Sequence, residues 1–277
     1  MDTHLVFIYG LCDDLLKALR HWEDPQCRVG DAEILTTALT AARFFGGNLT
    51  QAQTFLYEQR YFTHRLSHSR FIRRLHRCAH LLAPLFHVLA SLGHDLNPES
   101  LYVIDSFPVA ACDNIRINRS RRYRGEAWRG YQASKRRYFY GVKVHVVIAA
   151  SGQPVEFVLT PGADGDCKVL KQFNLDLPEG STLTGDKAYN DYAYEDLLKE
   201  LGLSLIPLRK ANSKRPLEPA LTYLMAKARQ AVETTGRLLE RLLPKHIHSV
   251  TARGFELKLG CFVIACALGF IDPRFPS

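Results

Sequence analysis

Long apolar runs are missing from this chain. The stretch 262–271 is apolar but too short to cross a membrane, and it ends at Asp272-Pro273. The N-terminus carries Asp2, Asp13 and Asp14 and lacks the basic start of a signal peptide. We therefore expect no membrane partner and a cytoplasmic location.

Cysteine pairs with the spacing of a metal or redox motif are also missing. The seven cysteines stand at positions 12, 27, 78, 112, 167, 261 and 266, and none belongs to a CxxC pair. An odd number argues against a complete set of intramolecular disulfides, which predicts reduced thiols in a cytosolic protein. The sequence also lacks internal repeats and low-complexity tracts.

Excess charge is absent from most of the chain and concentrated in one segment. The net charge of +8 divides into −1 for residues 1–112, +8 for residues 113–145 and +1 for residues 146–277. A dense basic segment favours a polyanionic partner, with nucleic acid ahead of an acidic membrane. A solvated basic loop is the alternative interpretation.

The pattern of apolar residues changes near residue 100. Residues 1–95 show helical spacing throughout and predict an α-helical N-terminal domain that binds DNA, and the linker contains Asn97-Pro98. Residues 101–277 alternate between strand-like and helical patterns, with a basic insertion at 113–137. The order is strand, hairpin, helix, strand, helix, strand, helix, which predicts an α/β domain with a five-stranded mixed sheet and flanking helices.

One predicted helix of the N-terminal domain carries a basic stripe. It runs from Ser67 or Ser69 to Leu92 and is expected to end at Gly93. Its arginines recur at helical spacing on one face, at Arg70, Arg73, Arg74 and Arg77. This stripe either contacts DNA, as in helix-turn-helix domains, or is a solvated surface paired with acidic neighbours.

Acidic side chains follow two predicted strands and occur on one long helix. Asp105 ends the apolar run 101–104 before Pro108, where strand pairing should weaken, and Asp186 follows Gly185 at the end of a second run. Glu233 lies within a long helical pattern, 221–243. Two Asp and one Glu are hard oxygen ligands suited to divalent ions that promote phosphodiester cleavage.

Four motifs carry a resemblance that spans nearly the whole chain. They are Val103-Ile104-Asp105-Ser106-Phe107-Pro108, Tyr140-Gly141-Val142-Lys143-Val144-His145, Gly185-Asp186-Lys187-Ala188-Tyr189 and Arg229-Gln230-Ala231-Val232-Glu233-Thr234-Thr235. In this order they resemble the DDE transposases of the ribonuclease H-like fold, most closely the insertion sequence 982 family. The resemblance implies a Mg²⁺-dependent enzyme, for which Mn²⁺ can substitute, that nicks transposon ends and joins the 3′-hydroxyl to target DNA. Asp105, Asp186 and Glu233 map onto its catalytic metal ligands.

The resemblance is incomplete around the Glu. Related transposases often show Tyr-x2-Arg-x3-Glu-x6-Lys; here Arg229 and Glu233 match, but Ala226 and Glu240 stand at the Tyr and Lys positions. Glu240 is therefore a rival third ligand. Glu233 is favoured because Arg229 and Arg237, four residues to either side, suit a phosphate site.

Cations and aromatic residues alternate in the basic segment. The aromatic residues are Tyr123, Trp128, Tyr131, Tyr138, Phe139 and Tyr140, and they can stack on unpaired bases. The expected DNA contacts of this segment are Arg119, Arg121, Arg122, Arg124, Arg129, Lys135, Arg136 and Arg137, joined by Lys143 and Lys187. His145 is more consistent with a core position.

Each of these features also has a purely structural interpretation. Asp186 fits a turn, Asp166 fits a helix cap, and Glu233 fits a surface pair with Arg229 and Arg237. Their joint occurrence around a basic insertion favours a transposase that acts on double-stranded DNA, at transposon ends and target, as a homodimer associated with the nucleoid. The alternatives are a metal-dependent nuclease or resolvase of the same fold, and a DNA-binding protein without catalysis.

Overall fold

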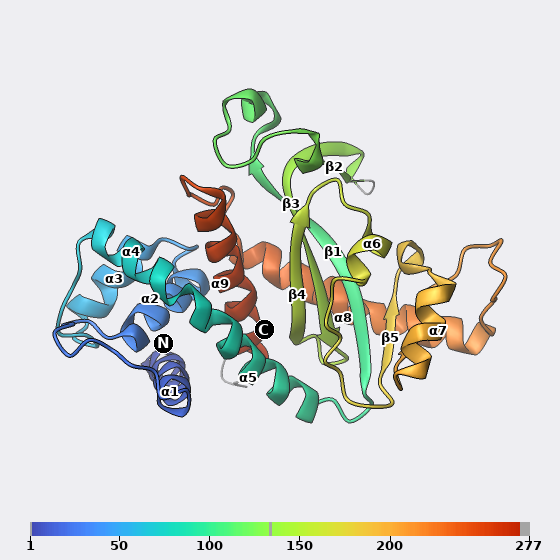
Figure 1. Cartoon of the computed structure of the whole chain (residues 1–277), viewed down its shortest axis with the longest axis horizontal. Helices are drawn as coiled ribbons and strands as arrows, with labels where there is room; N and C mark the ends of the chain where they lie inside the picture. Colours follow the sequence, from blue (N-terminus) through green and yellow to red (C-terminus); the bar gives the residue numbers. More distant parts are fainter. Residues whose placement is uncertain (1, 133–134, 272–277) are drawn as a thin grey trace. The chain divides into compact units, whose positions relative to one another are not determined.

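The computed structural model describes residues 2–132 and 135–271 (Figure 1). The chain divides into two compact units. The helical unit comprises Met1–Leu89 with Leu238–Ser277, and the sheet unit comprises Ala90–Arg237. Residues 238–277, which the sequence pattern attached to the α/β part, thus belong with the N-terminal helices.

The helical unit is built mainly on five helices among the described residues. They are α1 (Asp2–Ala18), α2 (Asp31–Phe44), α3 (Leu49–Glu58), α4 (His68–Cys78) and α9 (Ala252–Ile271). Helix α3 is capped at its N-terminus by Asn48, whose side chain accepts the backbone N–H of Gln51. All seven cysteines lie in the described part of the chain and are free thiols.

Helix α9 is longer and more apolar than expected from the sequence. At 20 residues it is long and apolar enough, by length and composition alone, to cross a membrane, so the prediction that the apolar segment is too short for this was wrong. However, 56% of its most apolar 18-residue window is buried inside the protein. It packs against α2. The close approach needs Gly47, where a Cβ would lie 2.8 Å from the Phe262 ring and where φ is +79°. This packing accounts for the apolar composition of α9.

The single long helix predicted from Ser67 or Ser69 to Leu92 is interrupted. A 3₁₀ turn, Ala79–Leu81, separates α4 from α5 (Leu82–Asp95). Gly93 does not end α5. It lies inside the helix, where a Cβ would come within 2.8 Å of the end of the Gln153 side chain and 3.1 Å of the Val155 side chain, so its lack of a side chain suits the close packing there.

Among its described residues, the sheet unit contains six strands rather than the predicted five. They are β1 (Leu101–Cys112), β2 (Arg129–Gln132), β3 (Arg137–Ala149), β4 (Pro154–Pro161), β5 (Thr182–Gly185) and β6 (Ser204–Leu205). β1, β3 and β4 form an antiparallel meander, and β2 pairs antiparallel with the N-terminal end of β3. On the other side of β1, β5 pairs parallel with β1, and β6 pairs parallel with β5. A meander followed by parallel strands on the far side of the first strand is the ribonuclease H-like topology, as predicted.

Strand β1 is longer than predicted and passes through Pro108. β5 pairs with β1 only from Leu101 to Ile104, whereas β3 pairs along its whole length. Beyond Ile104 one edge of β1 is therefore open, and a proline without an N–H is tolerated there. Asp105 therefore lies in the middle of β1, at the first residue beyond the part of β1 that pairs with β5.

The two faces of the sheet are covered by different helices. Tyr102 and Ile104 of β1 join a buried cluster with α6 (Asp166–Leu170) and α7 (Tyr192–Glu200). Asp105 points to the other face, since side chains alternate along a strand. There it meets Arg229 of α8 (Pro219–Leu242). In Figure 1, α6 and α7 lie in front of the sheet and α8 passes behind it.

Candidate active site

Asp105 and Asp186 are neighbours because their strands are in register. Ile104 pairs with Gly185 in the parallel β1–β5 ladder, so the next residue on each strand is an aspartate. Parallel strands lie about 4.8 Å apart. The Asp186 side chain accepts the backbone N–H of Ala188 at 2.6 Å, which fixes the turn after β5. The structure thus brings together the first two predicted ligands.

The electrostatics of Asp105 are those of a crowded acidic site. Burial raises the pKa of Asp105 to about 6, and the charges of Asp186 and Asp166 add to the increase. The backbone N–H of Ser106 and the guanidinium of Arg229 oppose it. Arg229 Nη2 lies 3.9 Å from Asp105 Oδ2. A bound cation would stabilise the ionised form of Asp105 and so offset this cost.

Glu233, the predicted third ligand, is exposed on α8. Among the described residues no group of three His, Cys, Asp or Glu side chains is close enough to hold a metal ion. The rival Glu240 is also exposed and belongs to the helical unit, whereas Glu233 belongs to the sheet unit with both aspartates. The structure therefore groups the two aspartates with Arg229 but leaves the third ligand apart.

Asp166 is a third aspartate near the pair, and sequence reasoning missed it. It begins α6 after Gly165, but its side chain does not cap that helix. Asp166 Oδ1 accepts hydrogen bonds from Ser106 Oγ at 3.0 Å and from Lys143 Nζ at 3.2 Å. The helix-cap interpretation was wrong because these partners come from β1 and β3, which no local pattern around Asp166 reveals.

Lys143 and His145 lie beneath the site on β3. Lys143 Nζ also donates to the Asp164 carbonyl at 2.9 Å, so this predicted phosphate contact is held within the protein. His145 is fully buried, as predicted, with Nε2 at 3.1 Å from Thr160 Oγ1. Burial lowers the pKa of His145 to about 4, so the ring is neutral at physiological pH.

Tyr189 closes the floor of the site. Its side chain is 1% exposed, and its hydroxyl has no hydrogen-bond partner among the described residues. Burial raises the pKa of Tyr189, and Asp166, Asp105 and Asp186 raise it further. The phenol is therefore neutral and lies buried within the electrostatic influence of the three aspartates. The motif Gly185-Asp186-Lys187-Ala188-Tyr189 was the available sequence signal, but it drew attention to Asp186 alone.

Most of the predicted DNA contacts are on the surface. In the sheet unit the exposed cations are Arg119, Arg121, Arg124, Arg129, Lys135, Arg136, Arg137, Lys187 and Arg237, and Arg122 is half-buried. In the helical unit Arg70, Arg73 and Arg77 are exposed. In the basic segment, the ion pair of Arg129 with Glu126 is long, at 3.8 Å, and exposed, so it neutralises little of the segment's charge.

Arg74 is the exception in the arginine stripe. Its guanidinium donates to Asp31 Oδ1 at 2.5 Å, to Glu23 Oε1 at 3.1 Å and to the Val29 carbonyl at 3.2 Å, and its side chain is 16% exposed. Burial raises the pKa of Asp31, but hydrogen bonds from Cys78, Arg74 and His21 outweigh it and lower the net pKa. Arg74 is thus a structural residue, and its predicted DNA role does not fit its surroundings.

We expect Arg74→Met to destabilise the protein by about 2–4 kcal/mol, because it leaves a partly buried Asp31 without its main cation. The exposed Arg73→Met is the matched control and should change stability by less than about 0.5 kcal/mol. Urea unfolding followed by circular dichroism measures both. The lowered pKa of Asp31 stabilises the folded state fully only above the ordinary pKa of an aspartate, about 4. The difference in the free energy of unfolding between the two variants should therefore shrink as the pH falls below about 4. Equal stabilities of the two variants at pH 7 would contradict the structural role.

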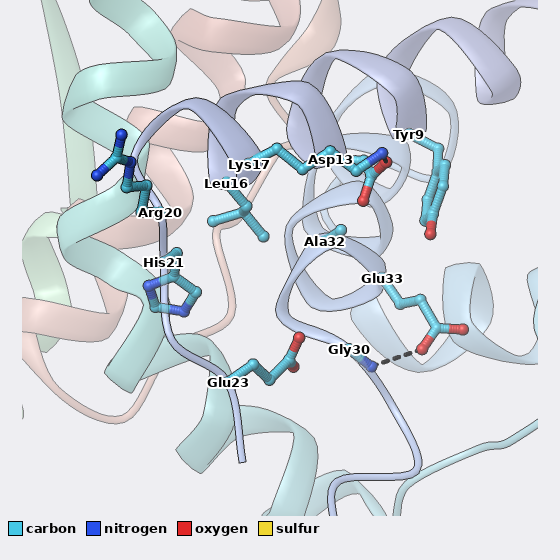
Figure 2. A pocket seen from close by; sticks show the side chains of 10 residues that line it. All are labelled: Tyr9, Asp13, Leu16, Lys17, Arg20, His21, Glu23, Gly30, Ala32 and Glu33. Atoms are coloured by element: carbon cyan, nitrogen blue, oxygen red, sulfur yellow. Dashed lines mark hydrogen bonds and ion pairs between the residues drawn. The ribbon is translucent and has the colours of Figure 1, made fainter. Parts of the chain in front are cut away.

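A separate cavity lies in the helical unit between α1 and the start of α2 (Figure 2). It has a volume of about 270 Å³ and is lined by side chains of both charges. Glu33 Oε2 accepts the backbone N–H of Gly30 at 2.6 Å, and Lys17 pairs with Asp13 at 2.5 Å. The cavity contains none of the predicted site residues. Two of its carboxylates, Glu23 and Glu33, accept backbone N–H groups at the start of α2.

Comparison with known proteins agrees with this geometry. Residues 96–248, more than half of the chain, match the family model described as a transposase DDE domain. The chain belongs to this family of DDE transposases. It is 33% identical over 107 residues to the transposase for insertion sequence element IS1106 of Neisseria meningitidis serogroup B, covering 38% of this chain and 37% of that protein.

The match to the curated relative thus spans little more than a third of that relative's length. Among solved structures, the chain is similar to a piggyBac transposase synaptic complex with hairpin DNA, studied by cryo-electron microscopy. The TM-score is 0.49 at 9% identity, over 95% of this chain and 72% of that chain. The expected membership of the insertion sequence 982 family stays a prediction.

Proposed function

We propose that the protein is a Mg²⁺-dependent transposase that cleaves transposon-end DNA and joins the freed 3′-hydroxyl to target DNA. The observation that carries the proposal is the pair Asp105 and Asp186, adjacent on parallel strands of a ribonuclease H-like sheet, within the region that matches the DDE family. Mn²⁺ would substitute for Mg²⁺, since both accept carboxylate oxygens.

The donor set fits a divalent cation in type and in charge. Asp105 and Asp186 would hold the metal, with Glu233 as the third ligand, and the raised pKa of Asp105 reflects crowding that a cation relieves. When bound, divalent ions activate a hydroxyl or water nucleophile and neutralise the phosphate. Arg229 balances the charge of Asp105 from α8, and the Ser106–Asp166–Lys143 hydrogen bonds keep β1 and α6 fixed beneath the aspartates.

The proposed DNA surface is the basic segment that joins β1 to β3. Its exposed arginines would neutralise phosphates and release counterions, and would thereby hold double-stranded end and target DNA on the protein. Joining two ends would require a homodimer on DNA. The protein would act in the cytoplasm at the nucleoid.

We test the function with labelled end DNA and a supercoiled target in Mg²⁺, Mn²⁺ or EDTA. Metal-dependent nicking followed by a joined product is the expected result for the purified protein. Nicking without joining would favour the nuclease or resolvase of the same fold. Binding without nicking in any metal would favour a DNA-binding protein that lacks catalysis.

The charge of the basic segment gives a second test. Replacing Arg121, Arg122 and Arg124 with Ala should weaken duplex binding and reduce the slope of log affinity against log salt by about one unit per lost phosphate contact. Fluorescence anisotropy over a salt series measures this. The matched control replaces Arg215, which pairs with Asp196 at 2.8 Å, and should leave the slope unchanged. Identical slopes for the triple variant and the wild type would contradict the proposed surface.

A further inference from the structure

Two tyrosines share one face of the β2–β3 hairpin. Tyr131 pairs directly with Tyr138 across the hairpin. Their ring centroids are 5.0 Å apart and the rings are inclined at 56°, so neither ring covers the face of the other. The residues are 51% and 53% exposed. The hairpin therefore presents two half-exposed aromatic rings to solvent.

The opposite face of the hairpin is anchored to the sheet unit. Gly130 pairs with Phe139, which is 6% exposed. A Cβ at Gly130 would lie 2.3 Å from the Gly162 carbonyl oxygen and 2.4 Å from the Phe139 ring, so only glycine fits. Because this face is packed, the orientation of Tyr131 and Tyr138 is fixed by the fold rather than by the side chains themselves.

Cations surround the tyrosine face. The Arg129 guanidinium lies 5.0 Å from the centroid of the Tyr138 ring, and Arg137 is exposed on the same hairpin. Directly before β2 in the sequence, Trp128 stacks on the buried Tyr123 with centroids 4.0 Å apart. Exposed aromatic rings beside arginines, on a rigid support, are the features of a site that takes a base and its phosphate.

We propose that Tyr131 and Tyr138 form a stacking platform for unpaired nucleotides of the DNA substrate. A base within a duplex has both faces covered by its neighbours, so only an unpaired base offers a face to the tyrosines. Arg129 and Arg137 would contact the adjoining phosphates. The inference rests on the proposed DNA function and specifies the form of DNA that this hairpin binds.

The test compares three probes on the full-length protein by fluorescence anisotropy. The probes are a single-stranded oligonucleotide, a forked duplex with an unpaired end, and a blunt duplex. The Tyr131→Ala/Tyr138→Ala variant should bind the single-stranded oligonucleotide and the forked duplex about 10–100-fold more weakly, because each lost stacking contact typically costs about tenfold in affinity. Its affinity for the blunt duplex should change little. Tyr131→Phe/Tyr138→Phe keeps the rings and should restore binding.

The matched control is Tyr223→Ala, which removes a tyrosine that is 67% exposed on α8. Its affinity for all three probes should equal that of the wild type. An equal loss of single-stranded and duplex binding in the Ala variant, or unchanged single-stranded binding with a wild-type circular dichroism spectrum, would overturn the platform. If the wild type bound none of the probes, the proposed DNA function itself would fail, which distinguishes the two outcomes.

Discussion

Asp105→Asn should abolish cleavage while leaving DNA binding intact. The substitution keeps the shape of the side chain but removes the negative charge that a divalent ion needs. We expect nicking and strand transfer to fall by at least about 10²–10³-fold, because charge stabilisation at the reacting phosphate is lost. Affinity for end DNA should stay the same or increase, since an acidic group that faces phosphate has been neutralised.

The fold should tolerate this change. The pKa of Asp105 is raised to about 6, above its ordinary value of 3.8, so ionisation of this residue costs stability as the pH rises from about 4 to 6. The asparagine variant has no such cost and should be at least as stable as the wild type at pH 7. Because the side chain is 35% exposed, the gain should be small. Loss of folding would instead mean that Asp105 organises the sheet.

Metal binding gives an independent measurement for the same variant. Binding of Mn²⁺ to the wild type should weaken as the pH falls through about 6, because a proton competes with the metal for Asp105. Asp105→Asn should bind Mn²⁺ weakly at every pH. Asp176→Asn, at an exposed aspartate, is the control and should behave as the wild type. Strand transfer retained by Asp105→Asn in Mg²⁺ would refute the DDE mechanism.

The position of Asp105 and Asp186 was predictable because both follow short strand-like runs. A parallel pair of such runs places the residues after them side by side, and the β1–β5 register does so. The strand content of residues 137–161 was predictable for a similar reason, from β-branched residues on either side of Gly152. In each case the signal is local and repeats with the period of a strand.

The features that sequence reasoning missed depend on distant partners. Asp166 looks like a helix cap until β1 and β3 bring Ser106 and Lys143 to it. Arg74 looks like one of four equivalent surface arginines until the chain around Asp31 folds over it. Gly93 resembles a helix end but serves a close contact with Gln153. A spacing rule cannot distinguish such residues, because tertiary contacts decide their roles.

The third acidic ligand is the part of the site that neither the sequence nor the grouping of side chains assigns. Glu233 and Glu240 are both exposed on α8 and, by helical geometry, project in similar directions from the residue that reaches Asp105. Distance along the helix separates them. At 1.5 Å per residue, Glu233 lies about 6 Å from Arg229 and Glu240 about 16 Å from it. Arg229 Nη2 is 3.9 Å from Asp105 Oδ2, so Glu233 is the carboxylate closer along the helix to the residue that reaches the site.

Glu233→Gln should therefore reduce cleavage by about 10²-fold or more and weaken Mn²⁺ binding, whereas Glu240→Gln should change both by less than about threefold. The pair is a matched comparison, because each substitution removes one negative charge from an exposed position of the same helix. Isothermal titration with Mn²⁺ and a nicking assay on the same preparations measure the two effects. The reverse order would make Glu240 the third ligand. Full activity in both variants, with Asp105→Asn inactive, would mean that the two aspartates suffice to hold the metal and that α8 contributes only Arg229.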